Sequence, residues 1–139
     1  MENLEFRAWY EDFCDGKWKM GELRSILWNR DAILIEVFSE DHLFIRPFNF
    51  ILMPSTGVKD IKRTKEYPKG QKIYAGDIVR VSSDDYLRVI EWSEDEASFK
   101  ARMLPNETDY IAPLYMNEGD FEVVGNIHQN PELLIARKK

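Results

Sequence analysis

The sequence predicts a mainly β fold, and two of its features support this class. Aromatic residues make up 13% of the 139 residues, and aromatic enrichment favours pleated, half-buried surfaces over helices. In the second half of the chain, short apolar runs alternate with turn-forming residues. No internal repeat or low-complexity tract interrupts this pattern. We therefore expect a small SH3-like barrel or meander over about residues 73–127, with an N-terminal β-hairpin region and a short C-terminal helix.

The first predicted elements are strands joined by a glycine turn. Phe6–Trp9 is a short aromatic run, and Lys17–Met20 returns beside it after the turn signal Asp15-Gly16. Leu23–Trp28 fits a helical turn and a strand equally well. Ala32–Phe38 is a further strand, because apolar and β-branched residues dominate it.

The run His42–Met53 is predicted to be extended, with aromatic side chains gathered on one face. A period of two places Phe44, Phe48 and Phe50 on the same face. Pro47 cannot donate a ladder hydrogen bond, so we expect it at a sheet edge or a bulge. Surplus aromatic residues at such an edge would mark a surface for self-association or for a partner protein. The alternative is that these three side chains belong to the core.

Pro54 and Gly57 are expected to end this run, and residues 59–72 are expected to form a basic loop. Pro68 and Gly70 interrupt regular structure there. Six basic side chains lie in the segment: Lys59, Lys62, Arg63, Lys65, Lys69 and Lys72. Beside tyrosines, such a loop can follow a nucleic-acid backbone while bases stack on the rings. The alternative is a solvated loop without a ligand.

Four strands are predicted in the second half: Asp77–Val81, Tyr86–Trp92, Ser98–Leu104 and Phe121–Val124. Polar turns separate them, at residues 82–85, 94–96 and 105–107. Tyr110–Met116 stays unassigned, because Pro113 interrupts it. Near the C-terminus, Asn130 is a plausible N-cap and Pro131 suits the first helical position. A short helix from Pro131 to about Arg137 is predicted, docked by its two leucines.

Composition places the chain among soluble globular proteins of a single domain. Hydrophobic residues make up 44% and charged residues 32%. A chain of this size buries roughly two-thirds of its unfolded surface, so it needs no metal or disulfide for stability. One core across residues 1–139 and two lobes, at 1–58 and 73–139 around the loop 59–72, both fit the sequence.

Charge and cysteine content indicate where the protein acts. The net charge is −6, which disfavours nucleic acid and anionic membranes as partners. Cys14 is the single cysteine, so an internal disulfide is excluded and a reducing compartment is expected. Met1-Glu2 begins no signal peptide, and no apolar run is long enough to cross a bilayer. We expect a cytoplasmic protein without a membrane partner.

No residue pattern predicts a catalytic residue, a metal site or a cofactor. His42 and His128 lie far apart, and neither has a histidine or cysteine at ligand spacing. Cys14 lies in no nucleophile motif. Three glycines at strand boundaries are assigned to backbone geometry: Gly57, Gly76 and Gly125.

An acidic cluster offers the alternative of a metal-dependent enzyme. Its members are Asp84, Asp85, Glu91, Glu94, Asp95 and Glu96. Carboxylate groups bind divalent cations and act as general acids or bases. Five of the six fall in predicted turns, where turn chemistry and solubility explain them without a function.

Five segments together resemble the YopX family: Phe6–Trp9, Thr56–Asp60, Ile73–Val79, Val124–Ile127 and Asn130–Leu134. This family consists of small proteins from phages and prophages of Gram-positive bacteria. The resemblance implies a mainly β protein that acts inside a bacterial host cell, and it supplies no catalytic residues. The loop 59–72 is longer than the family's common connection. Seven matching residues look like fold determinants: Gly57, Gly76, Asp77, Gly125, Asn126, Asn130 and Pro131.

The first functional hypothesis is a non-enzymatic module that binds a host or phage protein, or itself, through the aromatic edge or the C-terminal segment. The second is a nucleic-acid-binding accessory protein that uses the basic loop. The third is the metal-dependent enzyme.

Overall fold

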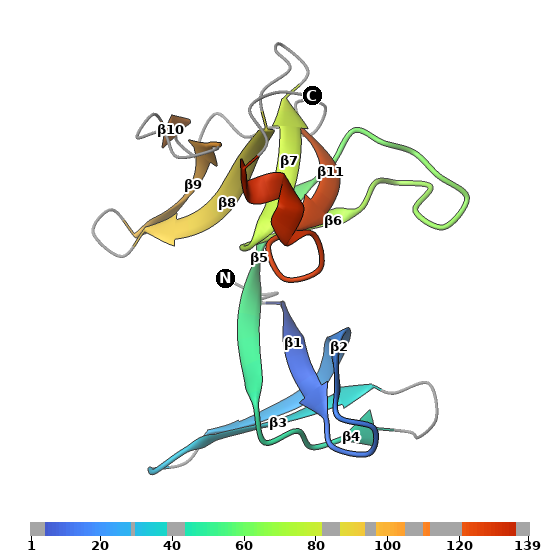
Figure 1. The fold of residues 1–139 in the computed structure, drawn as a ribbon, viewed down its shortest axis with the longest axis vertical. Coiled ribbons are helices and arrows are strands. Elements are labelled where there is room, and N and C mark those ends of the chain that lie inside the picture. The colour runs from blue at the N-terminus through green and yellow to red at the C-terminus, as the bar shows by residue number, and fades with distance from the viewer. Residues whose placement is uncertain are drawn as a thin grey trace. The chain divides into compact units, whose positions relative to one another are not determined.

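The computed structural model shows two antiparallel β sheets and, within the residues it describes, no α-helix (Figure 1). The described residues are 5–28, 30–38, 44–81, 87–93, 97–104, 110–111 and 121–135. The chain divides into two compact units, Met1–Pro54 and Ser55–Lys139. The prediction of a mainly β protein is confirmed.

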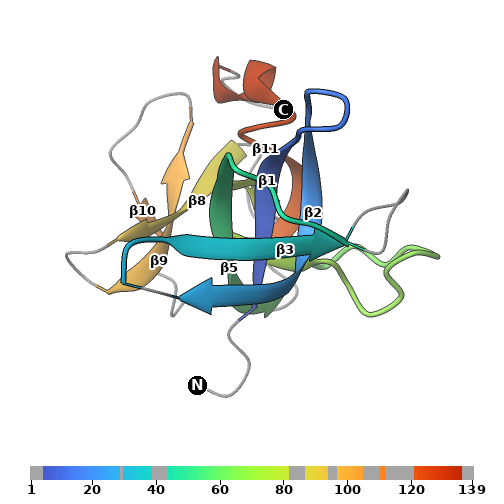
Figure 2. The same ribbon diagram turned by 90° about the horizontal axis from the view of Figure 1, so that it is seen from below.

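The first unit is a coiled antiparallel sheet. Its strands are β1 (Phe6–Asp12), β2 (Lys17–Trp28), β3 (Ile33–Phe38), β4 (Phe44–Ile45) and the first half of β5 (Phe50–Lys59). They follow the order β4-β3-β2-β1-β5. The β2–β3 register shifts between Leu23 and Ser25, and such a bulge bends a strand and increases its twist. In accord with this, β3 runs across the direction of β1 and β5 (Figure 2).

The inner face of this sheet carries the core of the first unit. Alternate residues of β1, Ala8 and Tyr10, pack with Ile35 and Val37 of β3. Gly21 of β2 lies so close to Tyr10 that an added Cβ would come within 2.9 Å of the ring. Glycine at this position therefore makes room for the aromatic side chain.

The second unit is built mainly from a five-stranded antiparallel meander. The strands of the whole second unit are the second half of β5, β6 (Lys72–Tyr74), β7 (Asp77–Val81), β8 (Leu87–Ser93), β9 (Ser98–Met103), β10 (Tyr110–Ile111) and β11 (Phe121–Asn126). The five strands of the meander follow the order β10-β9-β8-β7-β11, while β6 pairs with β5. A short 3-10 helix, η2 (Pro131–Ile135), follows β11.

Both faces of the meander are covered. Val79 and Ile90 pack with Phe121 in one buried cluster. Their neighbours Ile78 and Val89 belong to a second cluster, against which the two leucines of η2 pack. Because successive residues of β7 and β8 alternate between the two clusters, these strands lie at the centre of the second unit.

Most predicted strands are confirmed. The hairpin β1–β2 turns at Gly16, whose φ is 73°, in the left-handed region that glycine adopts without strain. Leu23–Trp28, which fitted two assignments, is the end of β2. The strands predicted at Asp77–Val81, Ser98–Leu104 and Phe121–Val124 are present within one or two residues of their expected ends.

The run His42–Met53 is not one strand. Pairing of β3 with β4 covers only Val37–Phe38 and Phe44–Ile45, and the chain is irregular from residue 46 to 49. Pro47 directly follows the edge strand β4, and its missing N–H cannot extend the ladder.

The expected strand end at Pro54 and Gly57 is wrong. Strand β5 continues through both residues to Lys59, although its register against β6 shifts between Ser55 and Lys59. The φ of Gly57 is 85°, so glycine accommodates the irregularity without breaking the strand.

Two finer predictions are also corrected. The second sheet is not closed into a barrel, because β10 and β11 lie at opposite ends of the strand order among the described residues. The C-terminal helix is only the 3-10 helix η2. Asn130 does not act as a side-chain N-cap there, because its Oδ1 accepts from the N–H of Asn126, on the strand side.

Candidate functional site

The motif residues around β7 form a turn held by buried hydrogen bonds. The Asp77 carboxylate is fully buried and accepts from the N–H of Tyr74 at 2.8 Å. Gly76 has a φ of 93° and donates its N–H to the carbonyl of Ile90. The Gly76 carbonyl accepts in turn from the N–H of Ile127 at 2.9 Å. This turn therefore joins β8 to the segment after β11.

The second motif closes on itself after β11. An added Cβ at Gly125 would lie only 2.5 Å from Asn130 Oδ1. That oxygen accepts from the N–H of Asn126 at 3.1 Å, and the Asn126 Oδ1 accepts from the N–H groups of His128 and Gln129. We refer to Gly125, Asn126 and Asn130 as the asparagine clasp. Its contacts are intramolecular and explain the motif as part of the fold.

Asp60 anchors the basic loop, a role that sequence reasoning missed. Its side chain is buried, with Oδ1 accepting from the N–H of Gln71 at 2.9 Å and Oδ2 from that of Val123 at 3.1 Å. The Asp60 N–H donates to the carbonyl of Gln71, and the N–H of Ile61 donates to that of Phe121. Asp60 belongs to a recognised motif, but its partners are distant in sequence.

Contacts within the loop give it a defined shape. Arg63 donates from Nη1 to the carbonyl of Asp60 at 2.6 Å, so this side chain braces the loop. Thr64 and Tyr67 form a turn in which Thr64 Oγ1 accepts from the N–H of Tyr67 at 2.9 Å. Gly70 has a φ of 95°, and an added Cβ would lie 2.6 Å from the Asp60 carbonyl oxygen.

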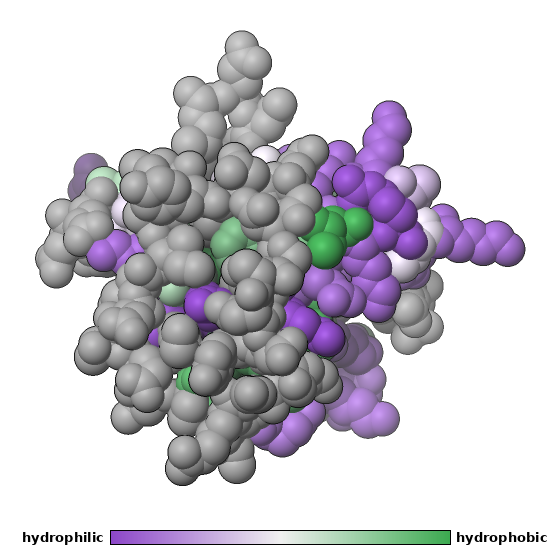
Figure 3. Space-filling view, turned by 90° about the horizontal axis from the view of Figure 1, so that it is seen from above, coloured by the Kyte–Doolittle hydropathy of each residue, from purple (hydrophilic) through white to green (hydrophobic). Residues whose placement is uncertain are grey.

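The lysines of the loop fall into two groups. Lys62, Lys65 and Lys69 are exposed, as is Tyr67, and hydrophilic residues project on this side of the second unit in Figure 3. Lys62 lies 3.7 Å from a carboxylate oxygen of Glu122. At the base of the loop, Lys59 of β5 and Lys72 of β6 are direct cross-strand partners.

The three phenylalanines predicted as an interface have different surroundings. Phe48 is 83% exposed, and its ring centroid lies 5.7 Å from that of Phe13. Phe50 is half-buried and packs against the core of the first unit. Phe44 is also half-buried, with the Arg24 guanidinium 4.2 Å above its ring centroid.

Arg24 belongs to a charged cluster that connects three strands. The Glu36 carboxylate of β3 binds the guanidinium groups of Arg24, on β2, and Arg46, after β4. The pKa of Glu36 is lowered, chiefly because the Ser25 hydroxyl and the Arg46 guanidinium donate hydrogen bonds to the carboxylate. The cluster covers Phe44 and holds β2, β3 and β4 together.

An open groove of about 780 Å3 lies within the first unit. Its walls come from the residues before and within β3, from the segment before β5 and the first residue of β5, and from β2. They are Arg30, Asp31, Ala32, Ile33, Phe48, Asn49, Phe50 and Trp18. Trp18 stacks on Trp9 at 6.1 Å between ring centroids. The groove therefore combines aromatic and polar lining residues.

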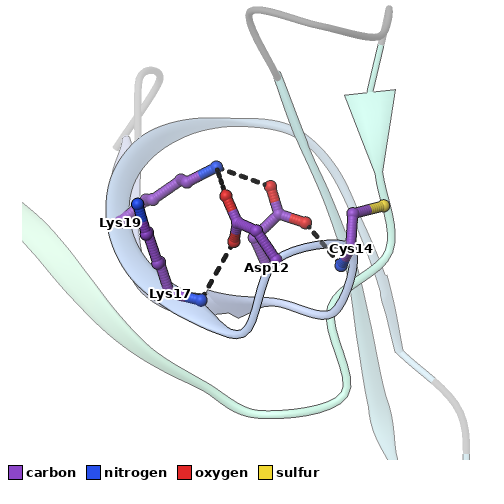
Figure 4. Close-up of polar contacts among 5 residues, drawn as sticks. Asp12, Cys14, Lys17 and Lys19 are labelled. Atoms are coloured by element: carbon purple, nitrogen blue, oxygen red, sulfur yellow. Dashed lines mark hydrogen bonds and ion pairs between the residues drawn. The ribbon is translucent and has the colours of Figure 1, made fainter.

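The turn between β1 and β2 contains Cys14 (Figure 4). Lys19 Nζ lies 2.8 Å from Asp12 Oδ2 and 2.9 Å from Asp15 Oδ2. The hydrogen bond from Lys19 lowers the pKa of Asp12, and the Lys17 N–H lowers that of Asp15. Cys14 is exposed, and partial desolvation together with the nearby Asp12 charge raises the pKa of its thiol. This turn has a structural explanation without catalysis.

The described residues hold no group of three or more His, Cys, Asp or Glu that could bind a metal ion. Five members of the predicted acidic cluster lie outside the described residues: Asp84, Asp85, Glu94, Asp95 and Glu96. The sixth, Glu91, pairs with Arg102 at 3.0 Å. His42 also lies outside them, and His128 takes part in the turn after β11.

The described part of the chain contains no helix with the length and apolarity needed to span a membrane. The molecule is thus a mainly β protein of two compact units, with an aromatic groove in the first and a braced basic loop in the second. Residues 5–135 match the model of the YopX protein family, so the chain belongs to this family. A comparison with curated proteins found no match.

Proposed function

We propose that this protein is a non-enzymatic interaction module, encoded by a phage or prophage and acting in the bacterial cytoplasm. It binds another protein, or a second copy of itself, through the aromatic groove of the first unit. The observation that carries this proposal is the distribution of exposed large apolar side chains. Of ten such side chains among the described residues, eight belong to the first unit: Phe13, Trp18, Leu27, Ile33, Leu34, Phe38, Phe48 and Ile51.

Phe48 is the centre of the proposed surface. A phenylalanine that keeps 83% of its surface in water gains little from folding. Burial against a partner would recover that hydrophobic free energy, and aromatic residues in pockets commonly dominate protein–protein interfaces. Trp18 and Phe50 flank it in the same groove and offer rigid apolar contact area.

The test compares three proteins: wild type, Phe48→Ser and the control Trp92→Ser. Trp92 is also an exposed aromatic residue, but it lies on β8 of the second unit. Sedimentation analysis should show a homo-oligomer that Phe48→Ser weakens by about ten-fold or more and that the control leaves intact. If all three are monomers, self-association is excluded. In that case, the capture of a host protein by cross-linking should require Phe48. Equal capture by all three proteins would refute the proposal.

A further inference from the structure

We propose that the loop at residues 61–72 is a preformed binding site for single-stranded nucleic acid, with Lys62, Lys65 and Lys69 contacting phosphates and Tyr67 stacking on a base. This function belongs to the second unit. It goes beyond the proposed protein-interaction surface and does not depend on it.

The loop is organised before any ligand arrives. The buried Asp60 carboxylate binds the N–H groups of Gln71 and Val123, which fixes the base of the loop against β11. Arg63 and the Thr64–Tyr67 turn brace its interior. A preformed loop loses little conformational entropy when it binds, so even a few contacts can produce measurable affinity.

Braced in this way, the loop presents its lysines outward. Every residue from 62 to 69 is exposed. Glu66 is the one carboxylate among residues 61–72, which include four lysines and one arginine. The surplus of positive charge is local, so it attracts a polyanion at short range although the whole chain carries a charge of −6.

The exposed Tyr67 ring indicates that the ligand of the loop is nucleic acid rather than an acidic protein. The Tyr67 side chain is 41% exposed, and this residue lies between Lys65 and Lys69 in the sequence. An aromatic face beside cationic groups matches the alternation of bases and phosphates in a single strand, where unpaired bases can stack. In a duplex the base faces are stacked on one another and cannot reach Tyr67.

The binding measurement is fluorescence anisotropy with a labelled single-stranded DNA and a duplex of the same sequence. Three phosphate contacts predict a slope of about −2 in log K against log salt, which is roughly a 20-fold loss of affinity between 50 and 200 mM salt. Lys65→Gln/Lys69→Gln should reduce affinity about ten-fold and flatten the salt dependence. Tyr67→Ala should weaken single-strand binding at least about five-fold. The control Lys17→Gln/Lys100→Gln removes the same charge elsewhere and should change affinity less than about two-fold.

Several results would overturn this inference. The absence of binding at low salt would do so, as would binding that the loop variants and the control reduce equally. If polyglutamate competes as well as single-stranded DNA and Tyr67→Ala has no effect, the loop recognises an acidic protein. Thermal melting of each variant separates loss of binding from loss of folding. Phe48→Ser should bind DNA as the wild type does, so failure of either proposal leaves the other standing.

Discussion

At the scale of single residues, the recognised motifs encode close approaches and hydrogen bonds. Gly125 is required because Asn130 Oδ1 occupies the space of a Cβ, and Asp77 accepts a buried hydrogen bond from a turn amide. The family resemblance identified Asp77 as a fold determinant, and the hydrogen bond from the N–H of Tyr74 gives a physical reason for an aspartate there. The sequence could not predict the partner of Asn130, since a capping asparagine and a clasp asparagine have the same local sequence.

Replacing Gly125 by alanine should destabilise the protein by about 1–3 kcal/mol, because the added methyl displaces Asn130 and its hydrogen bond to Asn126. Urea unfolding measures the change. In an Asn130→Ala background the two closest atoms, Oδ1 and Cγ, are absent and only the Cβ of residue 130 remains, 3.1 Å from the added methyl, so the same substitution should cost less. Additive costs for the two substitutions would contradict a direct contact between residues 125 and 130.

At the scale of elements, strand positions were predictable and strand pairings were not. Apolar runs bounded by turn residues located most strands, since local sequence determines where a strand can form. The break at residues 46–49 and the continuation of β5 through Pro54 depend on which neighbour each strand meets. The Arg24–Glu36–Arg46 cluster was likewise hidden, because its members come from three different strands or their ends.

The strands of the first unit should loosen in acid. The folded pKa of Glu36 is lowered, so its unfolded state binds protons more readily than its folded state. Its contribution is present above the unfolded pKa of about 4.3 and is lost as the pH falls through the folded pKa. Asp12 and Asp15 act in the same direction.

Thermal melting of wild type, Glu36→Gln and the control Glu22→Gln over a range of pH tests this expectation. Glu36→Gln should lower Tm at neutral pH, and its curve should approach the wild-type curve as Glu36 becomes protonated. Glu22 is an exposed carboxylate on β2, and its substitution should have a much smaller effect. Parallel curves for wild type and Glu36→Gln across the acid range would show that the arginine cluster is not the cause.

At the scale of the whole molecule, two candidate surfaces belong to two units with separate buried clusters. Composition limited the number of domains but could not locate the division at Pro54, because no linker marks it in the sequence. The basic loop was recognisable from its charges. The groove was not, because Trp18, Ile33 and Phe48 are brought together only by the coiling of the sheet.

Substitutions in the two surfaces should act independently. Phe48→Ser combined with Lys65→Gln/Lys69→Gln should lose self-association and nucleic-acid binding to the same extent as the separate variants. Sedimentation and anisotropy on one set of samples measure both. If either binding free energy in the combined variant differs from that in the corresponding separate variant by more than about 0.5 kcal/mol, the two units communicate.

Strand β5 belongs to both units: residues up to Pro54 pair with β1, and the register against β6 starts at Ser55. A protease that cut the chain at this boundary would therefore sever a paired strand, whereas most domain boundaries offer an exposed linker. Limited digestion should begin in the exposed lysine loop and leave the boundary intact. Dividing the protein at Pro54 would cut β5 in two, so each expressed half would keep only the part of this strand that pairs within it.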